Sequence, residues 1–142
     1  MNINSLVKSK ALRVRQIDKP KINSMIESAL ENVGVVMKIQ LNEKSATIIF
    51  REIYESIRQL GDANWWLLGY EPLSHEVTIE LLKSLDIKDK IKLNYLDRFR
   101  KIRNDANYRG FRISVAQANE IIEFWKFCSE DIINIIKNKL GK

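Results

Sequence analysis

The chain has 142 residues, a length that predicts one domain with a sizeable core. Hydrophobic residues make up 45% of it and charged residues 30%, which excludes a disordered chain and favours a globular one. Only 5 glycines and 2 prolines are present. This scarcity favours long helices over an all-β fold, which needs many more turn residues.

Few side chains are available for metal or nucleophile chemistry. Cys128 is the single cysteine and His75 the single histidine, which excludes a disulfide, a cysteine zinc cluster and nearly all histidine-based metal sites. The sequence also contains no glycine-rich phosphate loop. We therefore expect no metal and no cofactor, while the net charge of +6 permits an anionic partner without requiring one.

No part of the sequence is typical of a membrane or secreted protein. No apolar run approaches the roughly 20 residues that span a bilayer. Residues 1–9 lack the apolar core of a signal peptide. We therefore expect a cytoplasmic protein with no membrane partner.

Residues 1–19 form a basic leader, for which we expect either a short solvated helix or an ordered arm that contacts a polyanion. The first long helix should start near Asp18 or Lys19, with Pro20 in its first turn. Apolar side chains then recur at helical spacing as far as Met37. Gly34 interrupts this pattern, and we expect it to mark a close contact between helices.

The second helix should be capped by Asn42 or Ser45 and continue to Leu68, with Gly61 tolerated inside it or ending it. A break follows at residues 69–72. Ser74 is a good N-cap for a short third helix, which we place at residues 75–85.

The fourth helix is predicted over residues 88–108 and is ended by Gly110. Its apolar stripe consists of Tyr95, Phe99, Ile102 and Ala106. Ser114 and Gln117 have the spacing of a capping box for the last helix, which runs to about residue 140 with Cys128 in the core.

Short connections between long helices favour antiparallel neighbours. We therefore predict an all-α fold, an antiparallel up-and-down bundle of four long helices plus a short one. The domain organisation is a basic arm at residues 1–19 followed by a single helical domain at residues 20–142.

The fourth helix is the candidate functional element. Between residues 98 and 112 one acid, Asp105, stands against six basic residues: Arg98, Arg100, Lys101, Arg103, Arg109 and Arg112. At about 100° per residue, one face carries a polar strip, which consists of Arg100, Arg103, Asn104, Asn107 and Tyr108. Guanidinium groups bind phosphate in a bidentate manner, and tyrosine stacks on bases. The alternative is a solvated or dimer-facing helix surface.

The segment Arg103–Gly110, RNDANYRG, and the upstream segment Gly69–Leu82, GYEPLSHEVTIELL, resemble the HEPN domain family (higher eukaryotes and prokaryotes nucleotide-binding). The resemblance covers roughly residues 20–140. It implies an all-α bundle and a homodimer in which the motif strips of two subunits face each other. Many members of the family are metal-independent RNA endonucleases. Others bind nucleic acid, act as partners of minimal nucleotidyltransferases in toxin–antitoxin pairs, or have lost activity.

The resemblance assigns candidate catalytic roles to Arg103, Asn104 and Tyr108. Arg103 and Asn104 match the arginine and polar positions of the family motif, whereas Tyr108, or Asn107 with a gap one residue shorter, stands at the histidine position. A phenol of pKa about 10 is a poor base, and one acid–base catalyst contributes about 10²–10⁴ in rate. The resemblance therefore implies weak or lost endoribonuclease activity.

Candidate nucleic-acid-binding residues are Arg100, Arg103, Asn107, Arg109 and Arg112. His75 would replace the missing imidazole if the partner subunit brought it to the strip, but a histidine at a helix start more often bonds backbone or solvent. Three hypotheses remain open. They are an RNA- or nucleotide-binding domain with weak or lost cleavage, a non-enzymatic homodimer that binds a partner such as a nucleotidyltransferase, and a competent endoribonuclease that uses Tyr108.

Overall fold

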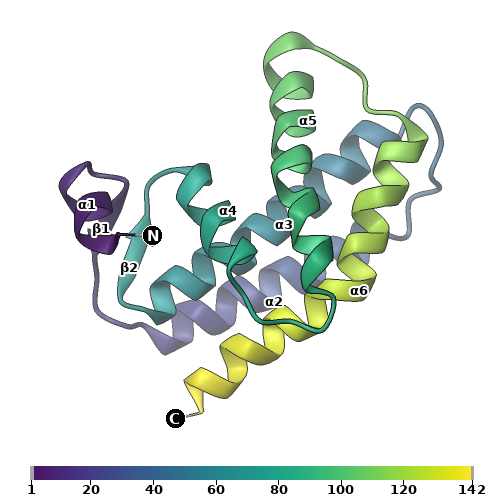
Figure 1. The fold of residues 1–142 in the computed structure, drawn as a ribbon. Coiled ribbons are helices and arrows are strands. Elements are labelled where there is room, and N and C mark those ends of the chain that lie inside the picture. The colour runs from purple at the N-terminus through teal and green to yellow at the C-terminus, as the bar shows by residue number, and fades with distance from the viewer. Residues whose placement is uncertain (1, 142) are drawn as a thin grey trace.

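A computed structural model describes residues 2–141 of the chain and shows a mostly helical protein with one small two-stranded sheet (Figure 1). In chain order the elements are α1 (Ile3–Lys8), β1 (Leu12–Val14), α2 (Lys19–Val36), α3 (Ala46–Leu67), β2 (Tyr70–Pro72), α4 (His75–Lys83), the 3₁₀ helix η1 (Lys90–Asn94), α5 (Tyr95–Arg109) and α6 (Val115–Leu140). The predicted helical class is thus confirmed. The antiparallel up-and-down order of four long helices stays a prediction.

The central element is α3, which packs against α2, α6, α4 and α5. Its apolar side chains point to several sides, and Phe50, Ile53, Tyr54 and Leu60 are fully buried. A helix that is apolar over most of its circumference is stable only when neighbours cover it on several sides. The core therefore lies around α3.

Three helix starts follow the predicted capping chemistry. Asp18 accepts a hydrogen bond from the Lys21 backbone N–H, 3.0 Å away. Ser74 caps α4, and Ser114 forms the predicted capping box with Gln117. Side-chain oxygens at these positions satisfy backbone donors that have no partner inside the helix.

The fourth helix differs from its prediction, because residues 88 and 89 lie outside any helix and residues 90–94 form the 3₁₀ helix η1. Tyr95, expected in the apolar stripe, is 45% exposed, and the neighbouring Leu96 is buried instead. Tyr95 does lie beside Phe99, on which its ring stacks. It stands at the edge of the apolar stripe in the first turn of α5, where part of the ring is exposed.

The basic leader packs on the helical domain rather than standing apart from it. β1 pairs antiparallel with β2, with Arg13 opposite Glu71. Leu12 is 2% exposed and lies in a small apolar cluster with Trp65 and Val77. The leader thus combines the short helix α1 with a strand that the periodicity did not reveal.

The close contact between helices that was expected at Gly34 is found at another glycine. Gly34 is exposed, and a Cβ there would meet no atom within 4 Å. Gly61 lies inside α3, where a Cβ would come within 2.5 Å of Thr78 Cγ2 and 3.0 Å of the Leu82 side chain. The close contact between helices is therefore at Gly61, between α3 and α4.

Within residues 2–141, no helix combines the length and the apolar character that crossing a membrane requires.

Candidate functional site

Helix α5 is anchored to the core at its N-terminal half only. Leu96 and Phe99 are buried, Ile102 and Ala106 are half-buried, and the last turn is exposed. Figure 1 shows the C-terminal end of α5 projecting beyond the neighbouring helices. As predicted, the helix ends at Gly110, whose φ of +68° favours glycine.

The polar strip divides into an inner and an outer part. Arg100, Arg103 and Asn104 are half-buried. Asn107 and Tyr108 are exposed, and Tyr108 at 78% is among the most exposed large side chains. Arg109 and Arg112, which were also predicted to bind nucleic acid, are exposed as well. The strip predicted as one contiguous polar face therefore has a half-buried inner part and an exposed outer end.

Arg103 lies on the buried tyrosine of α3. Its guanidinium carbon is 5.9 Å from the centre of the Tyr54 ring. Its Nη1 donates to Asn104 Oδ1 at 3.2 Å. A guanidinium over an aromatic face, held by an amide, loses less side-chain freedom on binding a ligand than a solvated arginine does.

Arg58, on α3, already holds the carboxylates of this region. It forms ion pairs with Glu55 and Asp62, and Asp62 Oδ1 also accepts a 2.7 Å hydrogen bond from Thr78 on α4. The hydrogen bond from Arg58 lowers the pKa of Glu55, whereas burial raises the pKa of Asp62. This network fastens α4 to α3 beside the arginines of α5.

Arg100 and Arg103 are different, because no carboxylate of residues 2–141 forms an ion pair with either of them. The acids on or near α5 are held by other cations, in the pairs Asp97–Lys83 at 2.7 Å, Asp105–Arg109 at 4.0 Å and Glu120–Arg98 at 2.7 Å. Two half-buried guanidinium groups on one face of α5 thus stand outside any ion pair of the described residues, although the Glu55 carboxylate is near enough for Arg103 to help lower its pKa. Such a pair of guanidiniums attracts an anion.

His75 lies beside Tyr54 and Arg103 of its own chain. A partner subunit is therefore not needed to bring this histidine close to Arg103. The ring centre of His75 is 6.5 Å from that of Tyr54, against which Arg103 also packs. Burial, with the positive charges of Arg58 and Arg103, lowers the pKa of His75. The protonated imidazolium is therefore disfavoured at this position.

Tyr54, which contacts both Arg103 and His75, is the residue of this site that the sequence did not reveal. It is fully buried, and its hydroxyl has no hydrogen-bond partner among the described residues. Burial raises its pKa against the opposing charges of Arg103 and Arg100. Helical spacing places Tyr54 inside but carries no signal that an arginine of α5 covers its ring.

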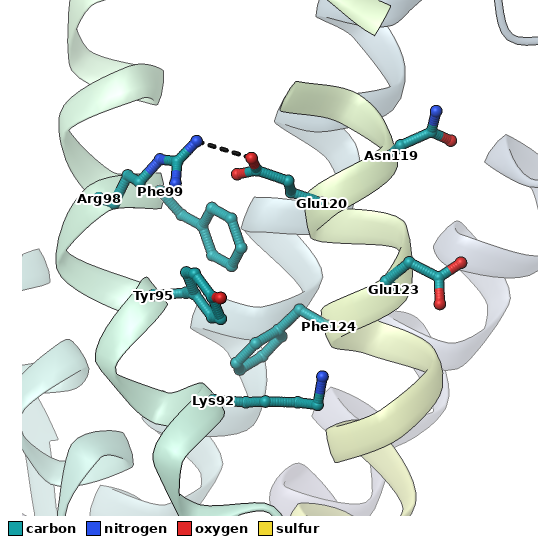
Figure 2. A pocket seen from close by; sticks show the side chains of 8 residues that line it. All are labelled: Lys92, Tyr95, Arg98, Phe99, Asn119, Glu120, Glu123 and Phe124. Carbon is teal, nitrogen blue, oxygen red and sulfur yellow. Dashed lines mark hydrogen bonds and ion pairs between the residues drawn. The ribbon is translucent and has the colours of Figure 1, made fainter. Parts of the chain in front are cut away.

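A second feature is a groove of about 290 Å³ between η1 and α5 on one side and α6 on the other (Figure 2). Tyr95 stacks on Phe99, with ring centres 6.1 Å apart, and Phe99 meets the edge of Phe124 at 5.5 Å. We call this feature the aromatic groove; its lining residues are Lys92, Tyr95, Arg98, Phe99, Asn119, Glu120, Glu123 and Phe124. None of these residues is among the predicted catalytic or binding residues, and Arg98 appears in the sequence prediction only as part of the basic run of residues 98–112.

The part of the chain that the structure describes contains no group of three or more His, Cys, Asp or Glu side chains arranged to hold a metal ion. Cys128 is buried, which raises its pKa to about 11 and suits a core residue.

Comparison with known proteins identified no relative: no family model, no curated protein and no solved structure matches this chain.

Proposed function

We propose that this chain is a HEPN-like helical domain that binds RNA or a nucleotide along α5, with weak or lost metal-independent endoribonuclease activity. The observation that carries the proposal is the pair of half-buried arginines, Arg100 and Arg103, with which no carboxylate of residues 2–141 forms an ion pair. The resemblance of the segment RNDANYRG to the family motif supports the same helix independently.

The length of the polar strip favours a polymeric anion over a single phosphate. Arg100 and Tyr108 are eight residues apart on one face of α5, which corresponds to about 12 Å along the helix axis. Arg103, Asn104 and Asn107 lie between them, and the end of the strip at Asn107 and Tyr108 is exposed. Guanidiniums, an amide and a phenol in one row can contact successive phosphates and bases of a single strand.

The proposed reaction is attack of a ribose 2′-OH on the adjacent phosphate, which leaves a cyclic phosphate and a 5′-OH. Arg103 would stabilise the charge that develops on the phosphoryl oxygens, and Asn104 would orient Arg103. Tyr108 is the candidate acid or base, and a phenol is a poorer general base than the imidazole that the family motif has at this position. Cleavage would therefore be slow even where RNA binds well.

RNA binding tests the proposal directly. We expect the wild-type protein to bind a labelled single-stranded RNA in fluorescence anisotropy, with an affinity that falls steeply as salt rises. Arg100→Ala and Arg103→Ala should each weaken binding and reduce the slope of log affinity against log salt by about 0.7. Arg51→Ala removes an exposed arginine from the start of α3 and is the matched control.

Two results would overturn the binding proposal: failure of the wild-type protein to bind RNA, or equal binding by the wild type and both arginine variants. Cleavage is measured separately in the presence of a chelator, with Arg103→Ala as the control for contaminating nuclease. Product that persists equally in Arg103→Ala would exclude Arg103 as a catalytic residue.

The second candidate function is a homodimeric interaction module, for example a partner of a nucleotidyltransferase in a toxin–antitoxin pair. It is favoured by two exposed aromatic side chains at the projecting end of α5, Tyr108 at 78% and Phe111 at 56%. Aromatic residues are enriched in protein interfaces. A dimer in light scattering that dissociates in Tyr108→Ser or Phe111→Ser, without salt-sensitive RNA binding, would favour this function over the first.

A further inference from the structure

We propose that the aromatic groove between α5 and α6 is a base-stacking subsite that takes one nucleobase of a single-stranded RNA. The inference rests on the proposed RNA-binding function and adds a second site to it. It starts from Tyr95, which is 45% exposed although its ring stacks on the buried Phe99. The exposed part of this supported ring is a platform on which a planar group can lie.

The groove is small and is bridged at one end, which suits a single planar group. Its volume is about 290 Å³, at the lower end of the range for small-ligand sites. An ion pair between Arg98 and Glu120, 2.7 Å long, bridges α5 and α6 above the rings (Figure 2). This bridge and the small volume favour one planar group over a helix or a flat protein surface.

Among the described residues, Lys92 is the cation of the groove that stands outside any ion pair. It extends along the side of Phe124 that is opposite the Arg98–Glu120 pair (Figure 2), and its ammonium lies 4.6 Å from the centre of the Phe127 ring. No carboxylate of residues 2–141 forms an ion pair with Lys92, whereas Arg98 is neutralised by Glu120, and Glu123 also lines the groove. A phosphate that flanks a base in the groove would thus be attracted to the Lys92 end.

The polar side chains of the rim do not provide readout of base edges. Asn119 and Glu123 extend from α6 away from the three aromatic rings (Figure 2). Recognition therefore depends on stacking and charge, which are tolerant of base identity. We expect similar affinities for adenine- and uracil-containing strands, and weaker binding of duplex RNA, in which the bases are already stacked on one another.

The test measures the affinity of a labelled single-stranded RNA for variants of Tyr95. Tyr95→Leu keeps an apolar side chain on Phe99 but removes the aromatic face, and we expect it to weaken binding about fivefold or more. Tyr95→Phe keeps the ring and should bind within about twofold of the wild type. Ile91→Ala truncates an exposed apolar side chain, 82% exposed, that does not line the groove, and it should have no effect.

The salt dependence separates this inference from the proposed function. Stacking releases no counterions, so Tyr95→Leu should leave the salt slope unchanged, whereas Arg100→Ala and Arg103→Ala reduce it. Normal binding by Tyr95→Leu, with weakened binding by the arginine variants, would overturn the groove and leave the proposed function standing. A Tyr95→Leu variant that keeps its RNA affinity but changes its oligomeric state would identify the groove as a protein contact. Failure of the wild type to bind RNA would overturn both.

Discussion

The guanidinium carbon of Arg103 lies 5.9 Å from the centre of the Tyr54 ring, and this contact joins the charged face of α5 to the buried centre of α3. Tyr54 has no exposed surface, so the ring is a fixed support. A cation over an aromatic face contributes about 0.5–2 kcal/mol, depending on its desolvation. The position of Arg103 is therefore determined by the core, although its charge is available to a ligand.

We predict that Tyr54→Phe increases stability. The hydroxyl of Tyr54 is buried without a hydrogen-bond partner among residues 2–141, and an unsatisfied buried polar group costs about 1–3 kcal/mol. Phenylalanine keeps the ring under Arg103 and removes this cost. Urea denaturation should show a higher midpoint for Tyr54→Phe and a lower one for Tyr54→Leu, which loses the ring. A lower midpoint for Tyr54→Phe would show that the hydroxyl does have a partner in solution.

We predict opposite effects for two glycine-to-alanine substitutions. In Gly61→Ala the new Cβ would come within 2.5 Å of Thr78 Cγ2, so α4 must move away from α3. Overpacking costs about 1–3 kcal/mol, which exceeds the gain of about 1 kcal/mol in helix propensity. Gly61→Ala should therefore lower the melting temperature.

The matched substitution Gly34→Ala should raise the melting temperature. Gly34 lies inside α2 with no atom within 4 Å of the added Cβ, so the helix gains about 0.5–1 kcal/mol without a clash. Calorimetry of the two variants checks both signs. Stabilisation by Gly61→Ala would contradict the close approach of α3 and α4.

Most helix boundaries could be predicted from the sequence, because they depend on local chemistry. Pro20, Ser74, Ser114 and Gly110 act on backbone groups within one turn, so their positions are informative without the rest of the fold. The strand β1 could not be predicted in this way. Its three residues are held by pairing with β2, about sixty positions later in the chain, and a segment so short has no periodicity.

The candidate site could be predicted only along α5. Spacing on one helix places Arg100 and Arg103 on one face, and the structure keeps them there. Spacing does not show which helix lies opposite, so it predicts neither the contact of Arg103 with Tyr54 nor the presence of His75 of the same chain beside Tyr54. The exposure of Tyr95 has a related cause: this residue lies at the edge of the apolar stripe, and spacing does not show how far the neighbouring helices cover that stripe.

We predict that His75 makes stability depend on pH. Burial and the nearby arginines lower its pKa from 6.5 in the folded protein, so the unfolded chain binds a proton at His75 more readily than the folded one. The free energy of unfolding should therefore fall as the pH drops from about 7 to about 5. His75→Gln removes this contribution, and its melting temperature should change less over that window. Equal pH dependence in the wild type and His75→Gln would contradict the prediction. The raised pKa of Asp62 acts with the opposite sign at lower pH, so the comparison stops near pH 5.

We predict that Tyr108→His increases metal-independent RNA cleavage. Tyr108 is 78% exposed on the last turn of α5, so a histidine fits there without disturbing the core. Its imidazole, with a pKa near 6.5, exchanges protons at neutral pH far more readily than a phenol does. One such group contributes about 10²–10⁴ in rate where the geometry is right. Cleavage of a single-stranded RNA in chelator should rise in Tyr108→His and be lost again in the double variant with Arg103→Ala. A Tyr108→His protein that binds RNA normally and cleaves it no faster than the wild type would show that the outer part of the polar strip is a binding surface only.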